Sequence, residues 1–575
     1  MFSPHHPLAP DRLPDGDVAW LGVNERLAPP LLPEGVASFA RNLRFREQRA
    51  EPRRGIGLCW WGRFDGSGAF DNVYGGGVVA DPSTGVESIL VAAEDIVWLT
   101  RPQNRAVEVP LNGHTLTSFS GFVQGRGVVY LLRGDDQAPL ICRDLANGFE
   151  ALPDPAPGFV AAPNARAGIY YLNRFMLVAG RDYLWVSDAP PGEGQFALDS
   201  IYQPNQGDPD ALVAVAAWNL DTLVALKERR VYLYLNASAG ASSAQFRNGS
   251  LNYGCIAPKS VVVAGSELFW LSAAGVANMR LTALNQEQGT TLLLSDDLPA
   301  TFRRVNWLAA HQARFEVSGS YLYCALPLDG STVCNAVAVY DLKHQLWAGV
   351  DESAVLSTGL LDWLQFGWQG RTRLGFIGGD GYIHIYEDGF EDELWDGEKV
   401  VRVDIATDLI TRGYTLRQEQ RKRYRQARVL MSTWDPEYAL SVIREGVAEE
   451  TTVAPTRTRN RAASRRYGAA AYDATNADDA HDDAGRMDYS LLLDGPLDEV
   501  VPPDGQRGPA APGSHGVYIG SGITPDLHQD STDTVALAGD GHWLQLRITN
   551  TQGRAVVRGV LLEAEDALPP VAVTS

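Results

Sequence analysis

The feature that most constrains the fold is a series of short, paired apolar runs along the middle of the chain. Between Gly55 and about Asp396, strand-length segments rich in β-branched and aromatic residues alternate with polar turns at hairpin spacing. Clear examples are Ile169–Leu172 with Phe175–Val178, Thr222–Leu226 with Val231–Tyr234, and Tyr321–Leu326 with Ala336–Tyr340. The pattern predicts an all-β region.

The spacing of the pairs favours one all-β architecture. They recur about every 40 to 50 residues, which is typical of the blades of a β-propeller, and the region has room for six or seven blades. Gly265 and Gly381 lie in turns suited to positive φ, and Gly75 to Gly77 predict a bulge. A short helix is expected at 298–307, where Pro299 stands near its start. The alternative is a large assembly of β-sandwiches.

The flanking regions differ from this repeat. Residues 1–54 are rich in proline and arginine and predict an extended N-terminal arm, ahead of a propeller at 55–397. Residues 398–575 predict a C-terminal β domain of sandwich or barrel type, with a long loop at about 454–487 that is poor in large hydrophobic residues. In that domain we expect separate strands at 427–434 and 438–443, and a terminal hairpin that turns at 551–554.

Composition limits the functional classes. The 575 residues carry a formal net charge of −21, which argues against a DNA-binding role that depends on a basic face. The five cysteines form no Cys-x-x-Cys pair, so neither a zinc site nor a disulfide framework is supported. No signal peptide and no run of about 20 apolar residues is present, and we expect a soluble protein without a membrane span.

No motif of catalysis or cofactor binding is found. The Gly-x-Ser-x-Gly elbow, the phosphate-binding loop, the dinucleotide fingerprint and His-Glu-x-x-His are all absent from the sequence. An acidic run at 387–393 does not have the spacing of a calcium loop, and a solvated loop is the favoured interpretation. We therefore expect no enzyme activity, no cofactor and no metal.

A basic block follows the predicted propeller. Between Arg412 and Arg428 seven positive charges stand against the single acidic Glu419, and they would repel one another if left unpaired. Because the chain as a whole is acidic, an assembly interface with an acidic protein surface is favoured. The solvent face of a strand comes second, and DNA contact third.

The N-terminal segment carries a loose motif. It places Gly, Asn, Ala and Arg in the order Gly-x-Asn-x-Arg, then Gly-x-Ala, Ala-x-Asn-x-x-Phe and Arg-Arg-Gly. The matching positions are Gly22, Asn24, Arg26, Gly35, Ala37, Ala40, Asn42, Phe45, Arg53 and Gly55. This order resembles the opening of the tail nozzle and tail-hub proteins of short-tailed bacteriophages, and of related phage tail proteins.

The C-terminal third strengthens that resemblance. Proteins of this type often carry a Thr-Arg-x-Tyr strand, a basic segment before a Trp strand, an Asp-Tyr-Ser phrase and an Asn-Thr-x-Gly-Arg segment. Here these are Thr411-Arg412 with Tyr414, 421–434, Gly485–Ser490, and 541–554. The two matching regions bracket the propeller-like middle.

The resemblance implies a structural virion protein. Six copies would form a ring at the distal tail that lines the DNA exit channel, retains packaged DNA and passes it during ejection. Its partners would be tail adaptor or connector proteins and tail fibres or spikes, with transient contact to phage DNA, after synthesis in the bacterial cytoplasm. The expected subunit-interface residues are Asn42, Arg44, Arg412, Arg421, Arg423 and Arg425. The alternatives are a glycan-binding or glycosidase propeller, or a minor tail protein of a long-tailed phage.

Overall fold

The computed structural model describes 13–59, 70–102, 106–188, 195–205, 207–219, 221–235, 237, 245–250, 253–280, 290–397, 399–416, 420–445, 451–453, 456–459, 529–537 and 540–566. The chain forms two compact units. We call 57–338 with 353–386 the propeller unit, and 1–56 with 339–352 and 387–575 the terminal unit.

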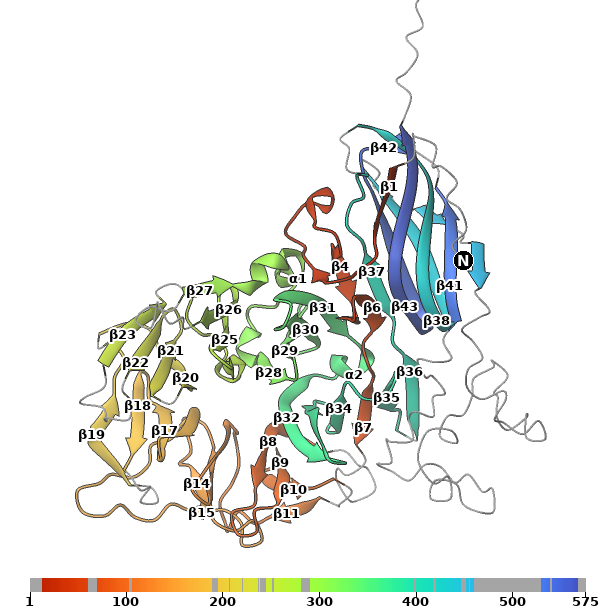
Figure 1. Ribbon diagram of the computed structural model, residues 1–575. Coiled ribbons are helices and arrows are strands. Elements are labelled where there is room, and N and C mark those ends of the chain that lie inside the picture. Colours follow the sequence, from red (N-terminus) through yellow and green to blue (C-terminus); the bar gives the residue numbers. More distant parts are fainter. Residues whose placement is uncertain are drawn as a thin grey trace, which may run out of the picture. The chain divides into compact units, whose positions relative to one another are not determined.

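The propeller unit contains six four-stranded antiparallel sheets, and in five of them the strands are consecutive in the chain (Figure 1). The first sheet contains β8 (Val73–Ala80), β9 (Glu87–Ala93), β10 (Ile96–Thr100) and β11 (Val107–Val109). The second contains β12 (Gly121–Gly125), β13 (Val128–Leu132), β14 (Leu140–Cys142) and β15 (Glu150–Ala151). The third contains β16 (Ala167–Tyr171), β17 (Arg174–Ala179), β18 (Tyr183–Ser187) and β19 (Phe196–Tyr202). The next two are β20 (Leu212–Asn219), β21 (Thr222–Lys227), β22 (Val231–Leu235) and β23 (Gln245–Ser250); and β24 (Val262–Ala264), β25 (Glu267–Ser272), β26 (Gly275–Arg280) and β27 (Thr290–Leu293).

The last sheet closes the ring. It joins β32 (Leu360–Trp368), β33 (Arg371–Gly378) and β34 (Ile383–Tyr386) to β7 (Ile56–Cys59), which comes from the start of the region. Between this sheet and β24–β27 lie β28 (Arg314–Ser318) and β29 (Tyr321–Leu326), with β30 (Ala336–Asp341) paired to β29. The inner strands β8, β12, β16, β20, β24, β28 and β32 contact one another in a closed cycle. The expected all-β propeller fold is confirmed: six four-stranded blades and the β28–β30 strands surround one axis.

The local predictions within this unit hold. The pairing register between β8 and β9 shifts between Val73 and Gly75, which is the predicted bulge. Gly265 and Gly381 both have positive φ at their turns. In the described ranges the α-helices are α1 (Pro299–Arg303) and α2 (Ala354–Ser357). The helix α1 begins at the predicted proline but ends at Arg303, before the expected end at 307.

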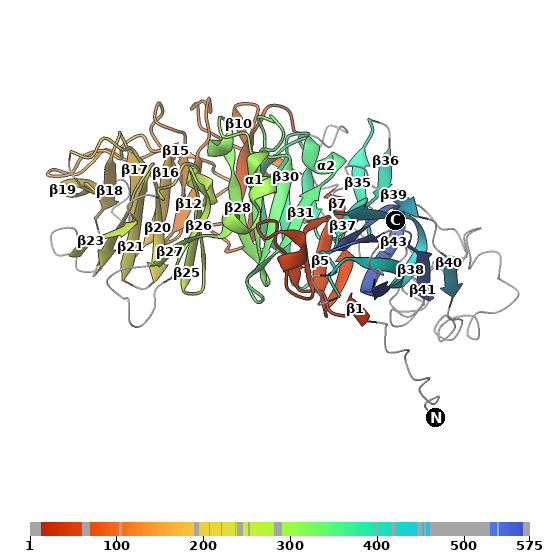
Figure 2. The same ribbon diagram turned by 90° about the horizontal axis from the view of Figure 1, so that it is seen from above.

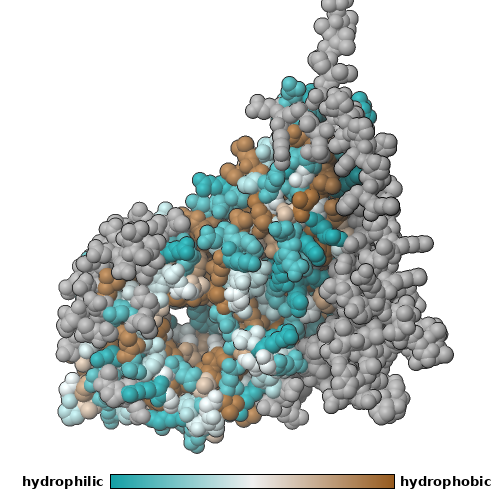
Figure 3. All heavy atoms as spheres, in the orientation of Figure 1, coloured by the Kyte–Doolittle hydropathy of each residue, from teal (hydrophilic) through white to brown (hydrophobic). Residues whose placement is uncertain are grey.

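Apolar side chains fill the space between neighbouring blades. Trp218 and Leu233 of one sheet pack with Leu268 and Trp270 of the next, and all four are 4% exposed or less. Figure 2 shows these sheets from the side, and Figure 3 shows that the ring is hollowed at its centre. Burial on both faces explains why the strands read as nearly continuous apolar runs.

Two long strands organise the terminal unit, β38 (Lys422–Arg444) and β43 (Leu544–Asp566), which pair along almost their whole length. Shorter strands flank them: β1 (Leu13–Asp17), β6 (Arg49–Pro52) and β37 (Thr407–Ile410) pair with β43, and β39 (Thr451–Val453), β41 (Gln529–Ala536) and β42 (Asp540–Gly541) pair with β38. The remaining strands are β2 (Gly22–Val23), β3 (Val36–Ala37), β4 (Phe39–Arg41), β5 (Leu43–Arg46), β31 (Leu346–Glu352), β35 (Glu391–Trp395), β36 (Val400–Asp404) and β40 (Thr456–Arg459).

The N-terminal segment is part of this sheet. β4 pairs with β37 and, in parallel, with β31, while β2 pairs with both β3 and β31. The segment therefore contributes short strands to a sheet whose long strands come from the other end of the chain.

The expected terminal hairpin is wrong, and so is the expected break after Trp434. Residues 544–566 form one strand, and 422–444 form another. Gly553 has a φ of +65°, and the register of the ladder shifts between Trp434 and Tyr438, opposite 550–554. The irregularity near Trp434 in β38 lies opposite the one near Gly553 in β43. Both strands stay paired on either side of this point, so the irregularities form bulges and do not end the strands. The loop at about 454–487, apart from β40, lies outside the described residues, as do Arg417, Glu419 and Gly485–Ser490.

Candidate functional site

Asn42 connects β4 to β5 in the left-handed backbone region, with a φ of +57°, which asparagine tolerates better than most residues. Its side-chain amide Nδ2 donates to the carbonyls of Glu352 (2.9 Å) and Ala406 (2.7 Å). Its Oδ1 accepts from the Glu352 backbone N–H (2.9 Å) and from Arg53 Nε (3.2 Å). The amide is 3% exposed and joins three separate stretches of the chain within the terminal unit.

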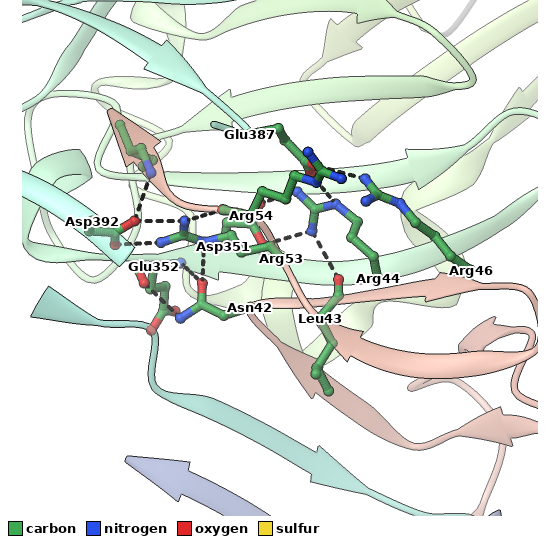
Figure 4. Close-up of polar contacts among 11 residues, drawn as sticks. Asn42, Leu43, Arg44, Arg46, Arg53, Arg54, Asp351, Glu352, Glu387 and Asp392 are labelled. Carbon is green, nitrogen blue, oxygen red and sulfur yellow. Dashed lines mark hydrogen bonds and ion pairs between the residues drawn. The ribbon is translucent and has the colours of Figure 1, made fainter. Parts of the chain in front are cut away.

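Arg44 is the centre of a buried ion-pair network (Figure 4). Its guanidinium donates to both carboxylate oxygens of Asp351, at 2.9 and 2.5 Å, and to Glu387 Oε1 at 2.6 Å. The side chains of Arg44 and Asp351 are both 0% exposed. Glu387 also accepts from Arg46 at 2.6 Å, so one carboxylate joins two arginines of the same strand.

Arg53, which directly follows β6, forms a similar ion pair with a buried carboxylate. It donates to both oxygens of Asp392, at 2.8 and 2.6 Å, and Asp392 Oδ1 also accepts from the backbone N–H of Ile56. The backbone carbonyls of Pro52 and Arg53 accept from Arg554, whose guanidinium lies 4.8 Å from the centre of the Phe390 ring. Burial lowers the pKa of Arg554 to about 10, so the two carbonyls and the Phe390 ring compensate only part of the cost of holding this cation away from water.

The acidic run at 387–393 therefore differs from its predicted role as a solvated loop. Asp392 and Glu393 are 4% and 6% exposed, and the Glu387 side chain is 12% exposed. Burial raises the pKa of Glu387, but the guanidiniums of Arg44 and Arg46 outweigh that effect and lower it overall. Arginines of the N-terminal segment neutralise Glu387 and Asp392, and Arg402 of β36 pairs with Glu393, so these carboxylates can lie away from water.

Arg412 forms a second buried cluster in the terminal unit. It donates to Asp17 Oδ1 at 2.9 Å and to Asp15 Oδ1 at 2.7 Å, and its guanidinium lies 4.8 Å from the centre of the Tyr414 ring. Asp17 also accepts from the Tyr414 hydroxyl and the backbone N–H of Gly35, both at 2.8 Å. Burial lowers the pKa of Arg412, but the two aspartates raise it overall. This cluster fixes β1 against the C-terminal part of the sheet.

Arg421, Arg423 and Arg425 lie differently. All three are exposed, and Arg423 and Arg425 alternate along β38 with buried Lys422 and Tyr424. We call Arg421, Arg423 and Arg425 the basic stripe. Among the six expected interface residues, the three of the stripe are exposed, while Asn42, Arg44 and Arg412 are buried and bond to other parts of their own chain.

Sequence reasoning missed three of the carboxylates that complete these clusters, Asp15, Asp17 and Asp351. It singled out Glu387 and Asp392 only as part of an acidic loop in solvent. The alternation of arginines at 44 and 46 within an apolar strand was a signal, because a buried arginine requires an acidic partner. The identity of the main partner, Asp351, depends on a contact between β5 and β31, which are about 300 residues apart in the chain, and the sequence does not display that contact.

In the described ranges, no three His, Cys, Asp or Glu side chains are placed to hold a metal ion. The five cysteines are buried free thiols, and burial raises the pKa of Cys142 to about 11 and that of Cys255 to about 12. No helix of the described residues has the length and apolar character needed to cross a membrane.

No model of a known protein family matches this chain, and no curated protein matches its sequence. Among solved structures it is similar to a streptogramin B lyase (12% identity, TM-score 0.40, 58% of this chain and 97% of that one). It is also similar to virginiamycin B lyase from Staphylococcus aureus (11%, 0.34, 54% and 94%) and to the computationally designed Ika8 protein (10%, 0.34, 57% and 99%). At these values the similarities carry no statement about function, and the fold rests on the strand pairings above.

The network around Glu387 leads to a pH prediction. Because the folded-state pKa of Glu387 lies below its ordinary value of 4.5, the unfolded chain binds a proton first on acidification. The stabilisation is present above about pH 4.5 and is lost as the pH falls through the folded-state pKa. We expect Glu387→Gln to flatten the loss of stability of the terminal unit below pH 4.5, measured by urea unfolding with hydrogen exchange. The exposed-site control Glu47→Gln should keep the wild-type slope, and equal slopes for Glu387→Gln and wild type would contradict the assignment.

Proposed function

We propose that this chain is a structural subunit of a phage tail, in a ring at the distal end of the tail that forms the DNA exit channel. One observation carries the proposal: the positions that bear the resemblance at both ends of the chain meet in the buried clusters of the terminal unit. Asn42 and Arg53 belong to one cluster and Arg412 and Tyr414 to another, while Arg554 bonds the backbone at Arg53. The motif residues thus build architecture, and no catalytic step is needed to explain them.

The mechanism of such a subunit is mechanical. Packaged DNA would be retained by a closed ring of copies, about six in number by the resemblance, and released when the ring changes shape. A net charge of −21 suits a wall along which a polyanion slides without adhering. The propeller unit would carry contacts to tail fibres or spikes, and the terminal unit would carry contacts to adaptor proteins and neighbouring copies.

Immunogold electron microscopy tests the proposal. Antibody against this chain should label the tail tip of particles in a phage lysate. Label on a short tail supports the nozzle, and label on a long tail shows a minor tail protein instead. Absence of label from every particle would overturn the structural role.

The basic stripe gives a second test, at the level of assembly. We expect the triple variant Arg421→Glu, Arg423→Glu and Arg425→Glu to weaken self-association of the chain more than tenfold, because reversing charges at an interface costs several kcal/mol. Mass photometry across a dilution series measures this. A charge-matched control reverses exposed arginines of the propeller unit: Arg126, Arg303 and Arg371. If the stripe variant assembles as wild type does, the interface lies elsewhere.

A further inference from the structure

The inner strands of the propeller unit bring a lysine, an arginine and an aspartate together. Lys259 stands just before β24, Arg314 opens β28, and Asp362 is the third residue of β32. Lys259 Nζ lies 2.8 and 2.7 Å from the two oxygens of Asp362, and Arg314 Nε lies 3.2 Å from Asp362 Oδ1. We call these three residues the channel cluster.

The channel cluster lies at the centre of the ring and does not belong to one pair of neighbouring blades. Lys259 enters the fifth sheet, yet its ammonium is 4.9 Å from the ring centre of Phe119, which precedes the second sheet. The backbone N–H of Gly76 in the first sheet donates to Asp362 Oδ2 at 3.0 Å. Gly76, Lys259 and Arg314 therefore meet at the one carboxylate of Asp362, and Phe119 joins them through Lys259.

The glycine run in β8 makes room for this carboxylate. A Cβ atom on Gly75 would lie 2.1 Å from Asp362 Oδ2, and the φ of Gly75 is +146°. The bulge at Gly75 thus lets the backbone approach Asp362 closely, and the amide of Gly76 holds the side chain in place.

The charges of the channel cluster do not cancel. Asp362 supplies one negative charge, and its two oxygens are already shared by Lys259, Arg314 and the Gly76 amide. Burial lowers the pKa of Lys259 and so does Arg314, while Asp362 raises it. One positive charge is therefore in excess in a partly desolvated position.

Solvent still reaches the two cations. The side chains of Lys259 and Arg314 are 24% and 18% exposed, against 7% for Asp362. Among the described residues, no acceptor other than Asp362 is hydrogen-bonded to the Lys259 ammonium, which has three N–H donors. An anion that enters the centre of the propeller can accept a hydrogen bond from the third N–H of Lys259, and the excess positive charge attracts it.

We propose that the channel cluster binds an oxyanion from solution, the carboxylate of an acidic sugar or an inorganic phosphate. Phe119, which touches the Lys259 ammonium, offers an apolar ring face beside the charge, as sugar C–H groups require. The site is independent of the proposed role in a tail, because it uses the propeller unit alone.

Titration calorimetry of the full chain tests this site with sodium glucuronate and, separately, with inorganic phosphate. We expect wild type to bind at least one of them, and we expect Lys259→Gln and Arg314→Gln to weaken binding by about 10-fold to 100-fold. Asp362→Asn should strengthen binding, because it removes the competing negative charge while keeping the shape of the side chain. Arg304→Gln, which breaks the ion pair with Asp329 at the surface of the same unit, is the control and should bind as wild type.

The outcomes distinguish an acidic sugar from phosphate as the ligand, and they distinguish a binding site from a purely structural cluster. Binding of glucuronate alone assigns an acidic sugar, and binding of phosphate alone assigns phosphate. The proposal fails if wild type binds neither anion, or if folded Lys259→Gln binds as wild type does. The cluster then only links neighbouring blades of the propeller. Where Lys259→Gln does not fold, Asp362→Asn decides: unchanged or weaker binding overturns the site.

Discussion

Replacing Arg44 with leucine is expected to lower the free energy of unfolding of the terminal unit by about 3–5 kcal/mol. The guanidinium has no exposed surface and is the partner that neutralises Asp351, which is also fully buried, and it shares Glu387 with Arg46. Without it, Asp351 loses the guanidinium that bonds both of its oxygens, while its carboxylate stays buried. Removing one partner of a buried pair costs more than the pair contributes, because the remaining ion keeps its desolvation penalty.

Hydrogen exchange along a denaturant series measures the effect, because it reports the strands of the terminal unit separately from the propeller unit. Arg41→Leu is the matched control: Arg41 lies three residues away, its side chain is 36% exposed, and its nearest approach to Glu352 is 3.8 Å. That substitution should cost less than about 1 kcal/mol. A loss for Arg44→Leu no larger than that of the control would show that the buried network does not hold the unit together.

The propeller could be predicted from the sequence because its contacts are local. Five of the six four-stranded blades are made of strands that follow one another in the chain, and the sixth adds only β7 from the start of the region. The hairpin spacing and the glycines at 75, 265 and 381 therefore directly describe the turns and the bulge. The helix at Pro299 follows from the same kind of local signal.

The terminal unit could not be predicted in the same way. Its sheet pairs β37 with β4 and β43 with β1, and these partners are separated by hundreds of residues. Local reasoning interpreted Gly553 as a turn, although long strands on both sides kept the chain extended through it. The chemistry of the candidate site failed for the same reason: the arginines were visible, but their aspartates and glutamates are brought to them only by the sheet.

The difference between local contacts in the propeller and non-local contacts in the terminal unit shows which part of the fold the resemblance to tail proteins concerns. The motif residues Asn42, Arg53 and Arg412 stand far apart in the chain, and each closes a contact between distant segments of one unit. A loose motif with such spacing describes how an N-terminal segment joins a sheet formed by C-terminal strands. Nothing in it describes the propeller.

Replacing Asp17 with alanine is expected to destabilise the terminal unit by about 3–5 kcal/mol, through the N-terminal strand β1. Asp17 is 1% exposed and accepts from Arg412, from the Tyr414 hydroxyl and from the backbone N–H of Gly35. Alanine leaves these three donors without their acceptor. Arg412 then keeps Asp15 as its carboxylate partner, while the Tyr414 hydroxyl is fully buried without an acceptor at Asp17.

A double-mutant cycle distinguishes this cluster from separate packing effects. If Asp17 acts through Arg412, the variant that combines Asp17→Ala with Arg412→Leu should be more stable than the sum of the two single losses predicts, by at least about 1 kcal/mol. Unfolding followed by hydrogen exchange in β1 and β43 supplies all four stabilities. Simple additivity would mean that the two side chains stabilise the sheet independently, and the N-terminal strand would then be held by its backbone ladder with β43 alone.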